Sequence, residues 1–349
     1  ASGLPADKCE VYKLHLGGGF GRRGAFHDYV TQAVRIAKQM PGVPIKLLWT
    51  REEDMRQGRF HPVTQCKLVG GLDANNNLTG LHMRISGQSI LTSVRPEALV
   101  KGMDPATFQG LANSGEFEFG YHTIPNLLID HAMRNPHVPP WFWRGVNNNQ
   151  NAIYLECFID ELAHAAGQDP LAFRRKMMAN KPKHLGVLNA VAERVGWDKP
   201  APQGISRGIC QHMGYGSYVA AAAEVSVTGN KVKVHRIVAA TNPGHAVNPA
   251  QIERQIAGSF VYGLSALFQG GITIKDGEVV EKNFDTFGSL RMAEMPKVES
   301  IIMPSNDFWG GVGEPTIFVA APAVLNAIFK ATGQRYRSFP LKNHNIQMA

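Results

Sequence analysis

The sequence predicts an α/β to α+β protein in which mixed sheets are flanked by helices. Segments that alternate like strands interleave with segments of helical periodicity, and Gly and Pro stand at the joints. Hydrophobic residues make up 44% and charged residues 18% of the 349 residues, which is ordinary for a globular protein and excludes disorder and coiled coil. The length suits two domains, and a Pro-rich stretch near residue 200 predicts units at 1–200 and 201–349.

Each expected element follows from a local pattern. The first half is expected to contain a strand at 10–16, a glycine cluster, a helix at 25–39, a strand at 45–49, a hairpin at 66–87 that turns at Asp73–Asn77, and an irregular stretch at 90–140. Asp and Asn before Pro mark helix starts, and Asn-Gly-type turns mark hairpins. The second half is expected to contain helices at 151–166, from Asp169-Pro170, from Asn248-Pro249 to 268 and at 321–332, strands around Gly229-Asn230, and a hairpin at Asp276-Gly277.

Charge and cysteine content narrow the class of protein. Lys and Arg number 36 against 28 Asp and Glu, a net charge of +8, but the basic residues are scattered, unlike a nucleic-acid patch. The excess favours anions such as a pyrophosphate or an acidic protein face. The four cysteines have no CxxC spacing, so we expect neither zinc nor an iron–sulfur cluster on this chain. No apolar run reaches about 18 residues, so no transmembrane helix is expected. The start at Ala1 suggests processing or a cut.

A glycine cluster follows the first expected strand. Residues 17–24 read GGGFGRRG, and this contains the G-x-G-x-x-G pattern of dinucleotide-binding loops between a strand and a helix. The acidic residue of that motif should follow after about 20 residues. The nearest candidate, Glu52, lies 28 residues past Gly24, so a Rossmann site is poorly supported. A tight turn, or a loop that aims backbone N–H groups at an anion or oxo group, remains open.

A polar loop leads into the helix expected at 151–166. Arg144 and Gln150 lie in and just after this loop, where the free N–H groups of a helix N-terminus can bind a phosphate or a pterin oxygen. An asparagine of the same loop could equally be a plain N-cap. Glu156 and Asp160 are spaced i, i+4, so we expect a solvated face or a pair with arginine rather than a catalytic role.

A second glycine-rich segment stands near the C-terminus. Residues 310–315 read GGVGEP, and three glycines before a carboxylate leave room beside Glu314. Glu314 could then accept a proton near neutral pH, although a plain surface turn has the same pattern. The histidines lack the mutual spacing of a metal site, and Ser259 is expected only to pack within a helix.

Taken in order, these segments resemble one family. LGGGFGRRG, WRGVNNNQNAIYLECFIDELAHAAGQDPLAFR, VNPAQIERQIAG and GGVGEP are similar to the molybdopterin-binding domain of molybdenum hydroxylases of the xanthine oxidase family. Within that family the chain most resembles the isoquinoline 1-oxidoreductase beta subunit and the membrane-linked aldehyde dehydrogenases. The resemblance covers essentially all 349 residues, but only about the C-terminal half of the family's large subunit. The chain is therefore expected to be one piece of a split, cleaved or separately encoded subunit.

The resemblance implies roles for particular residues. Glu314 matches the catalytic base next to molybdenum, and the metal itself is held by the dithiolene of the pterin rather than by protein ligands. The implied cofactor-binding residues are Gly18, Gly19, Phe20 and Gly21 of the first glycine loop, and Arg144, Gly145, Val146 and Gln150 of the polar loop. The chain departs from the family pattern in two places. Residues 145–149 read GVNNN instead of SVGHS, and residues 242–244 read NPG instead of DCG.

The resemblance also implies a reaction and its partners. The reaction is hydroxylation of an aldehyde or an N-heteroaromatic ring with water as the oxygen donor. The cofactor is molybdenum-molybdopterin cytosine dinucleotide, with [2Fe-2S] clusters on a partner subunit. Further partners are the N-terminal half of the molybdopterin subunit, as a separate or cleaved chain, and a c-type cytochrome subunit. The expected location is the periplasm or the periplasmic face of the inner membrane, with the cytoplasm as the alternative. An NAD or flavin oxidoreductase and a non-catalytic assembly half are the competing hypotheses.

Overall fold

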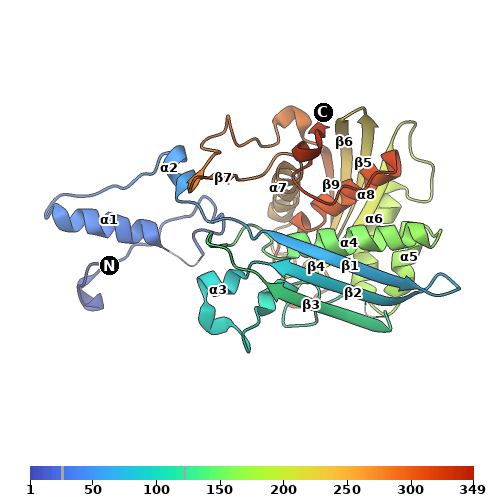
Figure 1. Ribbon diagram of the computed structural model, residues 1–349, viewed down its shortest axis with the longest axis horizontal. Coiled ribbons are helices and arrows are strands. Elements are labelled where there is room, and N and C mark those ends of the chain that lie inside the picture. The colour runs from blue at the N-terminus through green and yellow to red at the C-terminus, as the bar shows by residue number, and fades with distance from the viewer. Residues whose placement is uncertain (25–26, 122) are drawn as a thin grey trace.

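The computed structural model describes residues 1–24, 27–121 and 123–349. Two mixed sheets with flanking helices form the body of the protein, and an N-terminal arm extends away from it (Figure 1). This confirms the predicted fold class. The helices are α1 (Asp28–Gln39), α2 (Arg51–Arg56), α3 (Ile90–Val94), α4 (Asn148–Ala165), α5 (Pro170–Met177), α6 (Pro182–Val195), α7 (Pro249–Phe268) and α8 (Ala320–Thr332).

The strands belong to three sheets. They are β1 (Thr64–Leu72), β2 (Leu78–Gly87), β3 (Asn126–Met133), β4 (Ser206–Gly214), β5 (Ser217–Thr228), β6 (Lys231–Asn242), β7 (Ile274–Lys275), β8 (Glu278–Val279), β9 (Lys297–Ile302) and β10 (Gln347–Met348). In the first sheet β1 and β2 are antiparallel, and β3 lies parallel to β2. In the second, β4, β5 and β6 form an antiparallel meander, and β9 and β10 pair in parallel with β6. The short strands β7 and β8 form a separate hairpin.

Helices cover both faces of the second sheet. Helices α7 and α8 and one set of side chains from β5 and β6 form one apolar core. The opposite side chains of β5 and β6 pack with α6 in a second core, which also takes in the first sheet, α4 and α5. At Gly70 of β1 an added Cβ would lie 2.7 Å from Leu162 of α4, so glycine permits this close contact. Helix α4 therefore joins the two sheets.

The local signals for turns and caps are confirmed. The Asp73 carboxylate accepts hydrogen bonds from the backbone N–H groups of Asn75 and Asn77 in the β1–β2 turn. Asp169 caps α5 and Asn248 caps α7 through their side chains, as their positions before proline predict. The two expected hairpins of the second half are also present.

Other expectations are wrong or incomplete. Helix α4 begins at Asn148, three residues earlier than expected. The stretch 90–140 is irregular in part, but it contains α3 and the strand β3. The helix expected at 25–39 is described from Asp28 on, and its first residues at 25–26 lie outside the described residues. The division at residue 200 lies in the loop between α6 and β4 and stays a prediction.

The expected strands at 10–16 and 45–49 are wrong for this structure. Both segments are outside helices and strands, and they lie in the arm (Figure 1). Their backbone groups make no hydrogen bond with any residue that the structure describes. A strand needs a neighbouring strand, and neither segment has one here.

One segment has the length and apolar composition of a membrane span. It is Pro315–Thr332, which includes α8, and 78% of it is buried inside the protein. The sequence contains Pro, Asn and Lys within this stretch, which is why the search for an uninterrupted apolar run missed it. Its burial against β4 and β5 is that of a core helix.

Candidate active site

The turn that carries Glu314 is held by two neighbouring loops. The N–H of Gly310 donates to the Pro243 carbonyl at 2.7 Å, and the N–H of Gly311 donates to the Tyr215 carbonyl at 2.6 Å. The hydroxyl of Ser217 donates to the Gly311 carbonyl at 2.6 Å. A Cβ at Gly310 would lie 2.4 Å from the Gly216 carbonyl oxygen, so only glycine allows the turn between β4 and β5 to approach this closely. The turn before Glu314 is thus held by hydrogen bonds to the segment after β6 and to the β4–β5 turn.

The polar loop before α4 meets the Glu314 turn. The N–H of Gly145 donates to Oε1 of Glu314 at 3.0 Å. Nε of Arg144 donates to the Gly313 carbonyl at 2.7 Å, and its Nη2 donates to the Ser259 hydroxyl at 2.8 Å. Nη2 also reaches the carbonyl and side-chain oxygens of Gln255 at 3.0 and 3.1 Å. Two loops about 170 residues apart are thereby fixed against each other and against α7.

The electrostatics of the site follow from this packing. Burial lowers the pKa of the Arg144 guanidinium, while Tyr262 and the negative charge of Glu314 oppose the fall. Burial raises the pKa of the Tyr215 phenol, and the charge of Glu314 adds to the rise. Arg144 therefore stays charged and Tyr215 stays protonated at neutral pH. The site combines a carboxylate with a neighbouring cation and a neutral hydroxyl.

The first glycine loop reaches the same region. Gly21 has a φ of 73°, and a Cβ there would lie 2.0 Å from the Phe142 carbonyl oxygen. The ring of Phe20 lies 6.4 Å from the ring of Tyr262, and the Arg144 guanidinium lies 5.8 Å from that same ring. Tyr262 of α7 therefore stands between the glycine loop and Arg144. Phe20 itself is 66% exposed and has a φ of 52°, an uncommon conformation for a residue with a side chain.

Open space borders both the glycine loop and the glutamate. A Cβ built on Gly19 or Gly313 meets no atom within 4 Å. The N–H groups of Gly18, Gly19 and Phe20 donate no hydrogen bond to any residue that the structure describes. These features suit a bulky ligand with oxygen acceptors, because unpaired N–H groups then face the ligand.

The remaining predicted site residues stabilise the polar loop. Gly145 has a φ of 95°, and a Cβ there would lie 2.3 Å from the Asn149 side chain. Val146 is 8% exposed and has a φ of 49°. Gln150 donates to the Asn147 side chain at 2.8 Å, and its carbonyl lies 2.8 Å from Nε2 of His61. The structure thus brings Arg144 and Gly145 to Glu314 directly, whereas Gln150 contacts His61 and the loop itself.

Several residues of this site were missed from the sequence. Tyr215 lies in no motif, and Gln255 and Tyr262 were given no role, although Gln255 lies within the segment VNPAQIERQIAG. In the structure Tyr215 interacts electrostatically with Glu314, whereas Gln255 and Tyr262 contact Arg144. Ser259 was expected only to pack, but it is fully buried and accepts hydrogen bonds from Arg144 and Thr316. A signal was available for Tyr215, because Gly-Tyr-Gly between two strands predicts a tight turn whose central side chain projects from the sheet end.

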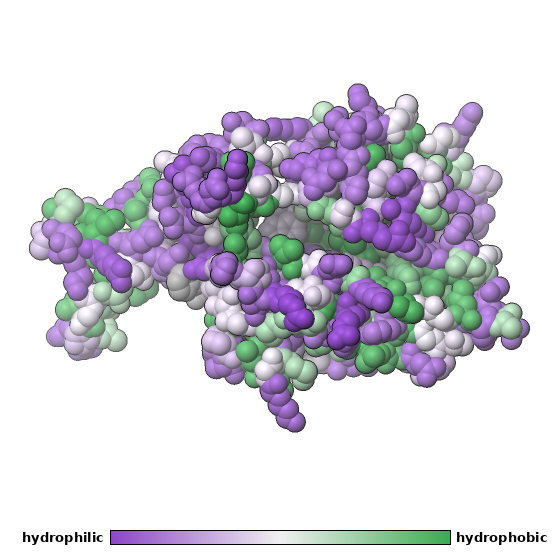
Figure 2. Space-filling model, in the orientation of Figure 1, coloured by the Kyte–Doolittle hydropathy of each residue, from purple (hydrophilic) through white to green (hydrophobic). Residues whose placement is uncertain are grey.

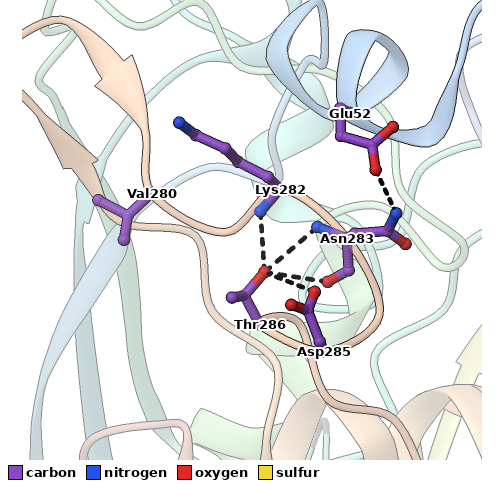
Figure 3. Close-up of a pocket in the computed structure, with 6 residues that line it drawn as sticks. All are labelled: Glu52, Val280, Lys282, Asn283, Asp285 and Thr286. Carbon is purple, nitrogen blue, oxygen red and sulfur yellow. Dashed lines mark hydrogen bonds between the residues drawn. The ribbon is translucent and has the colours of Figure 1, made fainter.

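A separate hollow lies near α2. It has a volume of about 480 Å³, and the Glu52 side chain there accepts a hydrogen bond from the amide of Asn283 (Figure 3). None of the residues predicted for the site contributes to it. Its lining residues are Glu52, Val280, Lys282, Asn283, Asp285 and Thr286. Glu52, the nearest acidic residue after the glycine cluster, thus bonds to Asn283 in this structure.

Comparison with known proteins shows to which family the chain belongs. A model of the molybdopterin cofactor-binding domain matches residues 1–178, and a second molybdopterin cofactor-binding domain model matches residues 162–296. The chain belongs to the molybdopterin cofactor-binding domain family. Both loops with Gly18 to Gly21 and Arg144 lie within the first match, and Glu314 follows the second. In the part of the chain that the structure describes, no group of three His, Cys, Asp or Glu could hold a metal ion.

The relatives and a solved structure agree with this family. The chain is 29% identical to the membrane-bound aldehyde dehydrogenase [pyrroloquinoline-quinone] of Gluconacetobacter polyoxogenes, over 98% of this chain and 47% of the relative. It is 26% identical to isoquinoline 1-oxidoreductase subunit beta of Brevundimonas diminuta, over 99% of this chain and 44% of the relative. Quinoline 2-oxidoreductase from Pseudomonas putida 86 has the same fold, with a TM-score of 0.74 and 12% identity, over 93% of this chain and 66% of that one.

These matches confirm the resemblance inferred from the motifs. They also show that the chain spans less than half the length of the two curated relatives.

Proposed function

We propose that this chain carries the catalytic glutamate of a molybdenum hydroxylase that oxidises an aldehyde to a carboxylic acid, or hydroxylates an N-heteroaromatic ring, with water as the oxygen donor. The observation that carries the proposal is the fixed carboxylate of Glu314, which accepts the N–H of Gly145 at 3.0 Å beside open space at Gly313. A carboxylate anchored through one oxygen keeps its other oxygen available to accept a proton.

The residues present fit a molybdopterin. The unpaired N–H groups of the first glycine loop and the open space beside Gly19 suit its oxygen-rich pterin and phosphate groups, and we propose the cytosine dinucleotide form. The cofactor supplies the two-electron oxidation chemistry when it is bound. The chain itself supplies orientation and a proton acceptor.

Each residue around Glu314 has a distinct part in this proposal. Gly145 holds the carboxylate by its N–H, and Arg144 fixes the preceding Gly313 carbonyl. Ser259 in turn orients Arg144. Glu314 takes the proton that is released when water becomes the new oxygen of the product.

The electrons are proposed to leave through [2Fe-2S] clusters on a partner subunit. The four cysteines of this chain lack the CxxC spacing common among cluster ligands, which supports clusters on another chain. Further proposed partners are the N-terminal half of the molybdopterin subunit and a c-type cytochrome subunit. We place the assembly in the periplasm or on the periplasmic face of the inner membrane. The name of the beta subunit relative, which is one component of an oxidoreductase, supports a complex of several chains.

One experiment tests the cofactor and the base together. The complex is purified natively, and its molybdenum, released nucleotide, flavin and quinone are measured. Glu314→Gln should retain the molybdenum and nucleotide while turnover falls by about two orders of magnitude or more. Asp285→Asn, in the separate hollow, is the matched control and should turn over normally. Flavin or pyrroloquinoline quinone in place of molybdenum would overturn the proposed cofactor. Normal turnover of Glu314→Gln would support a non-catalytic assembly half.

A further inference from the structure

The N-terminal arm, residues 1–49, contacts the body at its glycine loop and again just after its last residue. The glycine loop contacts the body where Gly21 meets Phe142 and where Phe20 meets Tyr262. Just after the arm, the Arg51 guanidinium lies 4.8 Å from the ring of Phe284, and Glu52 bonds to Asn283. Between these contacts α1 projects away from both sheets (Figure 1), and it has no buried residue.

Within the arm, helix α1 and the segment 45–49 pack against each other. The indole N–H of Trp49 donates to the Gln32 side chain of α1 at 3.1 Å, and the rings of Trp49 and Tyr29 are 6.5 Å apart. Ile45, Leu47 and Trp49 are partly buried, whereas the residues between them are exposed. This alternation with a period of two is that of a strand packed with one face on a helix.

No helix covers the side chains of the segment at 10–16, as far as the structure describes the chain. Val11 is 93% exposed, Tyr12 79%, Leu14 84% and Leu16 56%. Four large apolar side chains within six residues are thus exposed, and folded soluble proteins rarely leave so much apolar surface together in water. Figure 2 shows hydrophobic residues mixed with polar ones on the projecting arm. The backbone N–H and C=O groups of this segment and of 45–49 also lack partners among the described residues.

The segment 10–16, helix α1 and the segment 45–49 follow one another in the order of a strand, a helix and a strand. A strand, a helix and a second strand in sequence form a βαβ unit, in which both strands are parallel members of one sheet. Parallel strands are stable only within a larger sheet whose faces are covered. The two segments expected to be strands therefore lack the neighbouring strand that each would need.

We propose that the N-terminal arm is an incomplete βαβ unit that joins, through residues 10–16 and 45–49, the β-sheet of another polypeptide segment. This proposal deepens the partner named above, the half of the molybdopterin subunit that this chain does not contain. More than half of the length of both curated relatives has no counterpart in these 349 residues, which supports that occupant. The first 50 residues carry seven Lys and Arg against three Asp and Glu, so the partner's surface should be acidic.

The proposal has a consequence for the site. Residues 17–24 follow directly after the segment 10–16, so a strand at 10–16 would fix the point where the glycine loop begins. Association of the two segments would then order the loop that is proposed to bind the cofactor. Assembly and cofactor binding are coupled in this arrangement.

Hydrogen exchange on the native assembly, purified through a tag on this chain, tests the proposal directly. The backbone N–H groups of residues 11–16 and 45–49 should exchange about 100-fold more slowly than those of an exposed coil, because they are bonded in a sheet. Exchange at the rate of an exposed coil would overturn the proposal. The Glu314→Gln assembly should show the same protection, so that a failure of the proposed catalysis is distinguishable from a failure of this contact.

Two variants identify the occupant. Leu14→Asp places a charge on the uncovered strand segment and should reduce the partner recovered per molecule of soluble chain at least tenfold. Met292→Asp is the matched control, since Met292 is 97% exposed on the body, and it should recover the partner normally. Equal recovery with both variants would overturn the proposal. A homodimer of this chain that Leu14→Asp dissociates would also overturn it, because a second copy would then be the occupant.

Discussion

Replacing Arg174 by methionine should destabilise the protein far more than replacing an exposed arginine. Arg174 and Glu156 are both fully buried, and Nε of Arg174 lies 2.9 Å from Oε2 of Glu156. Glu156 also accepts hydrogen bonds from the Tyr121 hydroxyl at 2.5 Å and from the N–H of Gln211 at 3.2 Å. Arg174→Met leaves these neutral donors in place but removes the only full positive charge that Glu156 contacts at hydrogen-bond distance among the described residues.

The expected magnitude follows from this burial. Breaking a buried ion pair by removing one partner costs about 3–5 kcal/mol, because the other charge stays buried without compensation. Unfolding 349 residues at about 2.1 cal/mol/K per residue corresponds to about 0.7 kcal/mol/K, so the melting temperature should fall by about 4–7 °C. Arg194→Met is the control, because that side chain is 56% exposed and lies 3.9 Å from Glu299. Its effect should stay within about 1 kcal/mol.

The double variant Glu156→Gln, Arg174→Met tests the cause. It removes the uncompensated charge, so it should be more stable than Arg174→Met alone. The free energy of unfolding is measured by calorimetry or urea unfolding of the assembled complex, for the unaltered chain, the two single variants and the double variant. A loss below about 1 kcal/mol for Arg174→Met, or a double variant less stable than the single one, would refute this account of the buried pair.

Three further predictions concern the site and the arm. Tyr215→Phe keeps the ring and the backbone carbonyl that accepts the Gly311 N–H, but it removes the hydroxyl that interacts electrostatically with Glu314. The kcat should therefore fall about fivefold with little change in the melting temperature, and an unchanged kcat would count against a role for this hydroxyl. Burial lowers the pKa of His212 to about 3, so below pH 6.5 the unfolded chain binds a proton that the folded chain does not. Stability should therefore fall by about 1.4 kcal/mol per pH unit from about pH 6 to pH 3, and His212→Gln should lose this contribution in urea titrations. Expressed alone, the chain should aggregate or bind dyes for exposed apolar surface, whereas a monodisperse, cooperatively melting monomer would contradict the role given to the arm.

The sequence by itself determined the elements whose signals are local. The hairpin turn at Asp73–Asn77, the caps at Asp169 and Asn248 and the turn at Gly229-Asn230 all form where they were predicted. At Asp73, Asp169 and Asn248 the side chain that gives the signal accepts a hydrogen bond from a backbone N–H only two to four residues away. The motifs around Glu314 and Arg144 likewise indicated the family, because a motif is read from consecutive residues and needs no knowledge of the fold.

Only the tertiary structure decided the features that depend on distant partners. Glu156 was expected on a solvated face or with an arginine, and its full burial beside Arg174 follows from how α4 packs between two sheets. The roles of Tyr215 and Ser259 follow from their place in the fold, because Tyr215 interacts electrostatically with Glu314 and Ser259 accepts a hydrogen bond from Arg144. The segments 10–16 and 45–49 have the pattern of strands but remain unpaired, because a strand is completed by hydrogen bonds to another strand and the described part of this chain offers none.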